Sequence, residues 1–287
     1  MLHGSRAAHR DPPSRLPSSL PPSVHRPTLV LLAITVFGAC ARGGTTPVAP
    51  PRPSAPTIAD GPAVLKAMHA RYAGKWFSTL TFAQNTTTIS QSGREIKGVW
   101  NEYIAVPGRL RIDYQPLATR SGVLYAGGRI HAFTDGKPQT PQRGWNPLQL
   151  LVADVYGQSA DTTAFQLDSL GFDLTTIHQD RWQDKAMWVV GARAGDTTTS
   201  QFWIDKDSLL VRRVIQRDVR AARPVLSDIR FYRYQDVGGY PVAFDVHFYR
   251  DGRLFFKEEY FDVKVNVPIP PEVFDAAKWA VSQIKRP

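Results

Sequence analysis

The chain has 287 residues, a formal net charge of +10, 43% hydrophobic and 11% aromatic residues. This apolar content is enough for a sizeable core, so the bulk of the chain is expected to fold, and the single cysteine excludes an intramolecular disulfide framework. Of the charge, +3 precedes Cys40 and +7 is spread over the remainder among acidic residues. Such a modest excess suits an anionic membrane surface and does not by itself favour nucleic acid.

The first organised feature is an apolar run over residues 29–39, which ends in two small residues and is followed at once by Cys40. As a helix the run rises only about 16 Å, roughly half of a bilayer core, so it is too short to span a membrane. Its length, with His25 and Arg26 ahead of it, is typical of a signal-peptide hydrophobic region. A cysteine directly after two small residues resembles a bacterial lipobox, in which the thiol is acylated and the chain is cut just before it. The alternative is a buried strand with an incidental cysteine, but its proline-rich flanks offer no pairing partner.

These features predict three regions along the chain. Residues 1–39 are expected to be a lipoprotein signal peptide. Residues 1–23 are proline-rich, and we expect the natural start of translation to lie after them, nearer Val24. Residues 40–61 are the lipidated cysteine and a proline-rich tether, which reaches up to about 60 Å as polyproline II. Residues 62–287 form the folded domain.

The domain is expected to begin with a helix, because Asp60 can cap it and Pro62 is tolerated in its first turn. Apolar side chains at helical spacing follow at Val64, Leu65, Met68 and Tyr72.

After Gly74 the apolar pattern changes to period two, which predicts strands. Asp251-Gly252 lies between two alternating runs and is the strongest hairpin signal. The expected strands are residues 79–90, 98–105, 109–115, 123–126, 129–134, 174–179, 186–192, 200–205, 209–217, 226–235, 241–250 and 253–265.

A helical insertion interrupts the strands. Asn146-Pro147 is a capping residue followed by proline at the first helical position, and Asp161 is expected to cap a second short helix that ends at Gly171. The first insertion helix carries an apolar stripe of Leu148, Leu151, Val152 and Val155. The expected fold class is therefore mainly β (α+β): one antiparallel sheet of about ten to twelve strands with helices on one side.

Strand alternation assigns side chains to the two faces of this sheet. The candidate apolar face comprises Leu110, Ile112, Tyr114, Phe202, Ile204, Val242, Phe244, Val246 and Phe248. A solid core and a lipid cavity would both cover such a face. The 31 aromatic residues, with an insertion too small to fill a long sheet, favour a cavity.

Several segments resemble the LolA/LolB-type lipoprotein carrier family: residues 107–114 (PGRLRIDY), 124–131 (LYAGGRIH), 199–214 and 267–275. The resemblance implies an incomplete barrel, in which a curved antiparallel sheet has its concave apolar face covered by helices and binds acyl chains there. It also implies that residues 146–156 and 161–170 form the lid, and that Arg111 helps to hold the lid shut. Alternation instead directs Arg111 away from Leu110 and Ile112, so a surface salt bridge is the alternative role.

No enzyme signature is present. His69, His131, His178 and His247 are not at metal-ligand spacing, and no nucleophile elbow or phosphate loop is found. The acidic group Glu258, Glu259 and Asp262 is expected to be a solvated edge. We therefore expect no enzymatic activity, no cofactor and no metal.

The leading hypothesis is a monomeric protein of the bacterial cell envelope that binds acyl chains of lipids or lipoproteins and does not bind nucleic acid. Its lipid anchor would attach it to the membrane, at the periplasmic face of the outer membrane. The alternatives are an envelope-stress regulatory sensor with the same fold and a structural lipoprotein with a solid core.

Overall fold

The computed structural model of the chain describes residues 58–218 and 224–283. The predicted signal peptide, Cys40 and most of the tether lie outside these residues.

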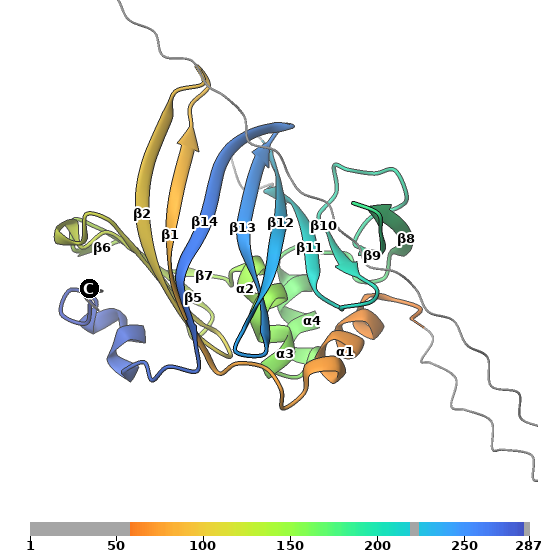
Figure 1. Ribbon diagram of the computed structural model, residues 1–287, viewed down its shortest axis with the longest axis horizontal. Helices are drawn as coiled ribbons and strands as arrows, with labels where there is room; N and C mark the ends of the chain where they lie inside the picture. The colour runs from red at the N-terminus through yellow and green to blue at the C-terminus, as the bar shows by residue number, and fades with distance from the viewer. Residues whose placement is uncertain (1–57, 219–223, 284–287) are drawn as a thin grey trace, which may run out of the picture. The chain divides into compact units, whose positions relative to one another are not determined.

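One antiparallel sheet of 14 strands forms the framework of the described residues (Figure 1). Its order is β6-β5-β4-β3-β2-β1-β14-β13-β12-β11-β10-β9-β8, with β7 paired to β5. The strands are β1 (Thr79–Ile89), β2 (Glu95–Ala105), β3 (Arg109–Tyr114), β4 (Gly122–Ala126), β5 (Arg129–Thr134), β6 (Lys137–Pro138), β7 (Gln142–Arg143), β8 (Ile177–Trp182), β9 (Lys185–Val190), β10 (Gln201–Asp205), β11 (Val211–Asp218), β12 (Val225–Val237), β13 (Tyr240–Arg250) and β14 (Arg253–Val265).

The middle of the sheet joins two segments that are far apart in the sequence. All other neighbours along the path are consecutive strands, but β1 pairs with β14, with Thr86 opposite Glu258. The predicted Asp251-Gly252 hairpin connects β13 to β14, and both residues have the positive φ that a tight hairpin turn requires. The strand β14 is therefore central, with β1 on one side and β13 on the other.

Short helices cover one face of the sheet (Figure 1). They are α1 (Gly61–Tyr72), α2 (Pro147–Gln149), the π-helical turn η2 (Leu150–Asp154), α3 (Val155–Gly157) and α4 (Ala160–Ser169); a separate 3-10 turn, η1 (Leu117–Thr119), follows β3. Asp60 caps α1 through a 2.8 Å hydrogen bond from the Ala63 amide, and Asn146 caps α2 through a 2.9 Å bond from the Leu148 amide. The insertion helix thus begins at the predicted residue, whereas Ser159, not Asp161, caps α4.

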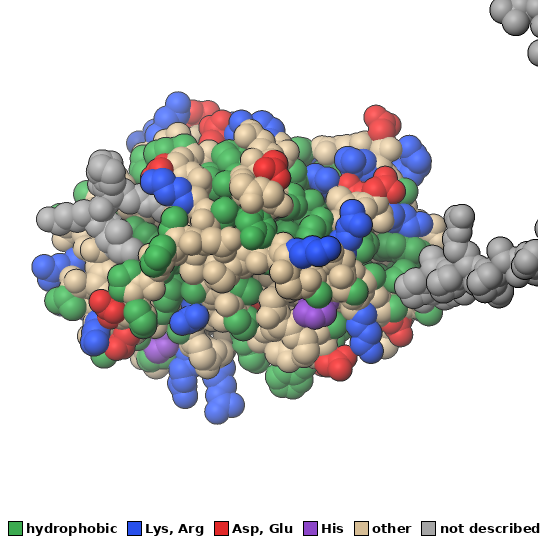
Figure 2. All heavy atoms as spheres, turned by 60° about the horizontal axis from the view of Figure 1, so that its bottom comes forward, with side chains coloured by type: hydrophobic (Ala, Val, Ile, Leu, Met, Phe, Trp, Pro, Cys, Tyr) green, Lys and Arg blue, Asp and Glu red, His purple; other side chains and the backbone are tan. Residues whose placement is uncertain are grey.

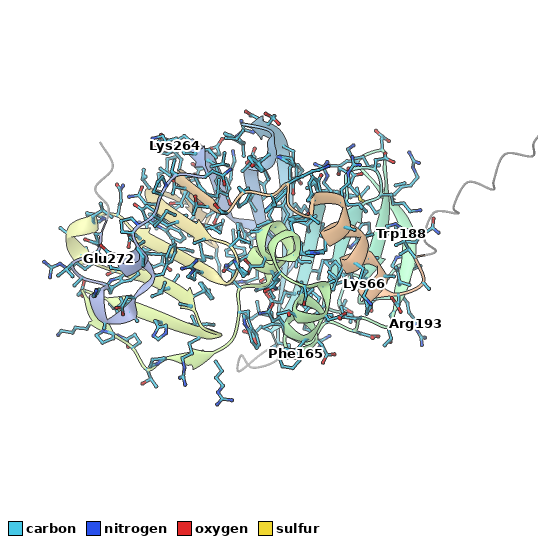
Figure 3. All side chains as sticks on the ribbon, turned by 90° about the horizontal axis from the view of Figure 1, so that it is seen from below. Lys66, Phe165, Trp188, Arg193, Lys264 and Glu272 are labelled. Atoms are coloured by element: carbon cyan, nitrogen blue, oxygen red, sulfur yellow. The ribbon has the colours of Figure 1, made fainter. Side chains whose placement is uncertain are left out.

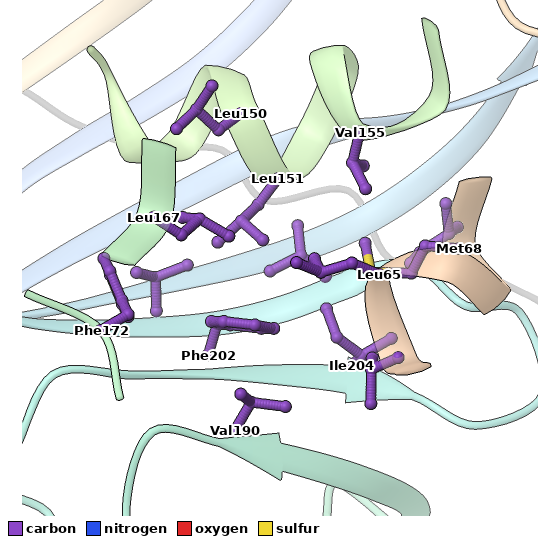
Figure 4. Packing of buried hydrophobic residues seen from close by; sticks show 14 of the residues in the cluster. Leu65, Met68, Leu150, Leu151, Val155, Leu167, Phe172, Val190, Phe202 and Ile204 are labelled. Atoms are coloured by element: carbon purple, nitrogen blue, oxygen red, sulfur yellow. The ribbon is translucent and has the colours of Figure 1, made fainter. Parts of the chain in front are cut away.

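The largest apolar core lies between these helices and the strands β9 to β13. Leu65 and Met68 from α1, together with Leu151 and Leu167 from the insertion, pack toward Phe202 on β10 (Figure 4). All five side chains are fully buried, so the sheet is packed solid in this region.

A C-terminal segment covers part of the opposite face of the sheet. It contains the 3-10 turns η3 (Pro271–Phe274) and η4 (Ala276–Lys278), followed by Trp279. Val273, Phe274 and Trp279 form a small core with Tyr103 of β2 and with residues of β3 to β5. Seen from below, Glu272 of this segment lies well apart from Lys66 of α1 and Phe165 of α4 (Figure 3).

The predicted fold class is confirmed: the protein is an open, curved antiparallel sheet with helices on its concave face. The two-residue strands β6 and β7 were not expected and raise the number of strands above twelve. The strand β8 begins three residues later than predicted, because Leu174 is buried beside α1 and its carbonyl accepts a 2.9 Å hydrogen bond from the Gly61 amide.

Candidate functional site

A cavity of about 260 Å³ lies between the concave face of the sheet and the helical insertion. Its wall contains side chains from β1, β2, β3, β11, β12, β13 and β14 and from α2, η2 and α3, most of them apolar or aromatic. The volume is just below the range of about 300–1,000 Å³ typical of small-molecule sites, so the cavity suits a single apolar chain better than a multi-chain lipid.

The structure brings many of the predicted cavity and lid residues together around this space. The predicted residues that line it are Leu110, Ile112, Val242, Val246 and Phe248 from the sheet, and Leu148 and Val152 from the lid. Tyr114 is not part of the wall, but its ring centroid lies 4.4 Å from that of Trp100, which is.

Other predicted cavity residues lie in solid core. Phe202 and Ile204 on β10 and Leu151 and Val155 of the insertion are fully buried in the main apolar cluster. Phe244 is half-buried and packs against a second cluster near Val242. Alternation identifies the face on which a side chain lies, but not whether a helix packs directly against that face. Where α1 and α4 cover the sheet, their side chains fill the space between helix and sheet. Where α2 and η2 cover it, that space is the cavity.

Arg111 is not a lid latch, and it does not form a surface salt bridge either. The guanidinium is fully buried on the opposite face of the sheet, beneath the C-terminal segment. Its Nε donates a 2.9 Å hydrogen bond to Asp113 Oδ1, and its Nη atoms donate to the carbonyls of Val273 and Trp279, each at 3.1 Å. Nη1 also donates to Ser282 Oγ at 2.8 Å, and the guanidinium carbon lies 4.0 Å from the centroid of the Trp279 ring.

The surroundings of Arg111 explain why its charge is tolerated inside the protein. A buried charge needs both an ion pair and hydrogen bonds for its remaining protons, and Arg111 has both. Burial raises the pKa of Asp113, and the neighbouring Arg111 charge opposes that rise. Arg111 therefore fixes the C-terminal segment to β3, which is a structural role.

One hydrogen bond that holds the lid to the sheet involves Asp154 in η2. Its Oδ1 accepts a 3.0 Å hydrogen bond from the Gly108 amide, in the turn between β2 and β3, and lies 3.4 Å from Gln149 Nε2. Asp154 is almost completely buried, and burial raises its pKa to about 6 against the opposing effect of these hydrogen bonds. The segment that the resemblance identified, residues 107–114, does meet the lid, but through a backbone amide rather than through Arg111.

The cavity wall includes a polar region at its centre. Glu102 on β2 and Glu258 on β14 both line the cavity, with only 7% and 8% of their surfaces exposed. Tyr260 donates a 3.0 Å hydrogen bond to Glu258 Oε2. The prediction of a solvated acidic edge is therefore wrong for Glu258, because β14 is a central strand. The prediction fits Glu259 better, because this residue lies on the face of β14 opposite Glu258, where its half-exposed carboxylate pairs with Lys257.

Both cavity carboxyls keep their protons to a higher pH than an ordinary glutamate does. Burial raises the pKa of Glu258 to about 7, although the Tyr260 hydroxyl and the Gln84 carboxamide favour its ionised form. Burial, and secondarily the charge of Glu258, raises the pKa of Glu102 well above its usual range. These two groups are close enough to influence each other and are in an environment that resists two negative charges.

Sequence reasoning missed a set of aromatic residues in the wall. Phe82 on β1 stacks on Tyr260 of β14 with ring centroids 4.1 Å apart, and Trp76 lies 4.1 Å from the ring of Tyr156. All four line the cavity. The alternation of Leu80 and Phe82 was available as a signal, but the pairing of β1 with β14 could not be inferred from local patterns.

The helix-bearing side of the molecule carries charges of both signs. Figure 2 shows Lys and Arg side chains intermingled with Asp and Glu around apolar patches. One exposed apolar side chain, Phe165 on α4, is 65% exposed and meets Trp145 edge-on at 6.2 Å. This surface is thus mixed in character and presents no single-sign field on the described residues visible there.

Two further observations concern chemistry and membranes. Within residues 58–218 and 224–283, no group of three or more His, Cys, Asp and Glu side chains could hold a metal ion. No helix in this part of the chain has the length and apolar character needed to cross a bilayer.

Comparison by sequence does not identify relatives: no protein-family profile matches the chain, and no curated protein matches it. Comparison by structure does. An outer-membrane lipoprotein-sorting protein domain from Vibrio parahaemolyticus superimposes with a TM-score of 0.52, at 12% identity over 77% of this chain and 98% of that one. A DUF1329 family protein from Desulfovibrio piger gives a TM-score of 0.51, at 12% identity over 76% of this chain and 97% of that one.

A LolA superfamily protein from Nitrosomonas europaea is also similar, with a TM-score of 0.48 at 12% identity over 73% of this chain and 96% of that one. The two better superpositions extend over nearly the whole of each neighbour, and they are the ones that establish the architecture. At these identities the likeness concerns architecture alone. The chain shares the fold of the lipoprotein-sorting protein domain and of the DUF1329 family protein.

Proposed function

We propose that the protein is a membrane-anchored, periplasmic lipid- or lipoprotein-binding protein that holds an acyl chain in its concave cavity. The observation that carries the proposal is the apolar cavity of about 260 Å³ beneath the lid. An empty apolar space of this size forfeits packing that a solid core would gain, so an apolar occupant would stabilise the fold. The cavity also argues against the alternative of a structural lipoprotein with a solid core.

The lid is suited to admitting such a ligand. Residues 147–157 combine two three-residue helices with the π-helical turn η2, and a turn of this kind is common at functional sites. The buried hydrogen bond from Gly108 to Asp154 holds the lid against the sheet. Opening would break this contact and uncover Leu148 and Val152, so the same residues would serve as both cover and binding surface.

The lipid anchor at Cys40 is the second part of the proposal. An anchored protein would hold its cavity within reach of one membrane, at the end of a tether of about 60 Å. Replacing Cys40 with alanine should release the protein from membranes into the soluble envelope fraction without changing its thermal unfolding. A Cys40→Ala protein that still partitions with membranes would contradict the anchor.

The cavity part is tested by native mass spectrometry of Cys40→Ala protein purified without detergent. We expect a bound acyl-chain species that gentle activation releases. Adding Val152→Trp, which places a large ring in the cavity from the lid side, should abolish the bound species. The matched control Val281→Trp places the same ring at a position that is 84% exposed and should leave it bound. Finding empty protein in every case would leave the solid-core alternative.

A further inference from the structure

Two carboxyls that line the cavity, Glu102 and Glu258, flank a third polar side chain, Gln84, which is fully buried beside the cavity wall. Along β1, Phe82, Gln84 and Thr86 alternate on the concave face, where Glu102 lies opposite Phe82 and Glu258 lies opposite Thr86. Gln84 is therefore diagonal to both carboxyls, at the spacing where long side chains on neighbouring strands meet. The strands that flank it place Trp100 and Tyr260, both cavity residues, directly opposite Gln84.

Gln84 lacks the hydrogen bonds that its burial requires. Its side chain is fully buried and lies near enough to Glu258 to favour the ionised form of that carboxyl, yet neither Oε1 nor Nε2 makes a hydrogen bond of good geometry with the residues that the structure describes. Among the cavity-lining residues of this part of the chain there is no lysine or arginine. Buried polar groups are nearly always satisfied, so Gln84 leaves hydrogen-bonding capacity beside the two cavity carboxyls.

On the opposite face of the neighbouring strand β3, a buried carboxylate has a buried cation beside it. There, Asp113 has the Arg111 guanidinium at 2.9 Å, and the guanidinium has three further hydrogen-bond acceptors. In the cavity wall, Glu258 accepts a hydrogen bond from the Tyr260 hydroxyl. The described residues of the wall include no lysine or arginine that could balance the charge of Glu258.

We propose that the cavity wall at Glu102 and Glu258, with Gln84 buried between them, binds the hydrogen-bond-donating, cationic end of a single-chain amphiphile, with an alkylammonium as the simplest case. This inference rests on the proposed function, since the chain of the amphiphile occupies the apolar part of the cavity. An ammonium donates up to three hydrogen bonds, and the carboxyls of Glu102 and Glu258 can accept them at the cavity wall. A fatty-acid carboxylate at the same place would add a negative charge to a low-dielectric site that already contains two acidic groups.

Burial and the mutual influence of the carboxyls agree with this assignment. The pKa of Glu258 is raised to about 7, so a bound cation can shift this group to its ionised form near neutral pH. The titratable groups near the pair are the hydroxyls of Tyr114, Tyr125 and Tyr260, whose pKa values are raised by burial first and by the carboxyl charges second or later. The whole chain carries a net charge of +10, which attracts anions non-specifically. A preference of the cavity for a cationic amphiphile would therefore come from the local carboxyls and not from the overall charge.

The test is isothermal titration of the Cys40→Ala protein with dodecylamine, dodecanol and dodecanoic acid at pH 7.5, below the concentrations at which they form micelles. We expect dodecylamine to bind at least about ten-fold more tightly than dodecanoic acid, with dodecanol between them. In the Glu102→Gln/Glu258→Gln variant the three affinities should converge, because both carboxyls are removed with little change in shape. The control Glu259→Gln removes a carboxylate from the opposite face of the same strand and should leave the order unchanged.

The outcomes separate the two proposals. Dodecanoic acid binding as tightly as dodecylamine would overturn the assignment of the polar wall, and would leave acyl-chain binding supported. An order that persists in the double variant would also overturn it. If none of the three amphiphiles binds to a protein with a normal unfolding transition, the proposed function fails together with this inference.

Discussion

Buried charged groups have different surroundings on the two faces of the sheet. On the face covered by the C-terminal segment, Arg111 and Asp113 form an ion pair whose hydrogen bonds extend to Val273, Trp279 and Ser282. On the concave face, Glu102 and Glu258 line an apolar cavity in which the described residues supply no lysine or arginine.

The difference distinguishes an ion pair that holds the fold together from two carboxyls that line a cavity. Burial alone does not separate them, because Arg111, Glu102 and Glu258 are all at least nine-tenths buried. What separates them is the presence of an opposite charge: Arg111 lies 2.9 Å from Asp113, whereas the described residues of the cavity wall include no lysine or arginine.

The greatest loss of stability is expected from breaking the Arg111–Asp113 pair. Arg111→Leu should lower the free energy of unfolding by about 3–5 kcal/mol, because it leaves Asp113 buried without its partner. The control Arg109→Leu changes an exposed arginine two residues away and should cost far less. Urea denaturation followed by tryptophan fluorescence measures both.

A double variant sharpens the same prediction. Arg111→Leu/Asp113→Leu removes both charges and should unfold at higher urea than Arg111→Leu alone. If the double variant is as unstable as the sum of the two single variants, the ion pair is not what places Arg111 there.

A smaller effect is expected for Asp154, on the cavity side. Its pKa of about 6 in the folded protein exceeds the ordinary value of 3.8, so the unfolded chain loses this proton first as pH rises. The contribution of Asp154 to stability is therefore greatest at low pH, declines as pH rises through the interval between these two values, and stays low above it. Asp154→Asn keeps an oxygen for the Gly108 amide and removes the titration.

The Asn variant should be more stable than the wild type by about 2–3 kcal/mol at pH 8, and the gain should vanish near pH 4. Thermal unfolding across this pH range measures the difference. A variant that is less stable than the wild type at pH 8 would mean that the lid is held by the ionised carboxylate and that burial does not penalise this charge.

The smallest effect is expected for Glu259, the neighbour of Glu258 that faces the other way. Its carboxylate pairs with Lys257 at 3.1 Å, and both side chains are partly exposed to solvent. Glu259→Gln should change the free energy of unfolding by less than about 1 kcal/mol, and added salt should reduce the change further. A larger loss of unfolding free energy would show that removing a carboxylate from the central strand β14 is costly whichever face of the sheet it lies on.

Most of the fold could be predicted from local sequence patterns. Period-two alternation located the long strands, Asn146-Pro147 located the start of the lid, and Asp251-Gly252 located a hairpin. These features depend on neighbouring residues, so a single sequence is enough to reveal them.

The site depends on contacts between distant residues, and there the predictions were less accurate. Leu110 and Val246 line the cavity, whereas Phe202 and Ile204, also on the apolar face, lie in solid core beneath α1 and α4. The burial of Glu258 depends on β14 pairing with β1, about 170 residues away in the sequence. No local pattern carries that information.

The sequence left two roles open for Arg111, a lid latch implied by the family resemblance and an outward position implied by strand alternation. Alternation predicted the correct face. It directed Arg111 to the face opposite Leu110, where the structure places it. What alternation could not supply was the C-terminal segment that covers that face and turns an expected surface position into a buried one.

Photocrosslinking with a dodecylamine that carries a diazirine in its chain would show most directly whether the concave face holds the ligand. We expect crosslinks to cavity residues such as Leu110, Ile112 and Val242, and their loss when Val152→Trp fills the cavity. Crosslinks to the exposed apolar side chains Ile96, Phe165 and Val281, unaffected by Val152→Trp, would contradict binding in the cavity.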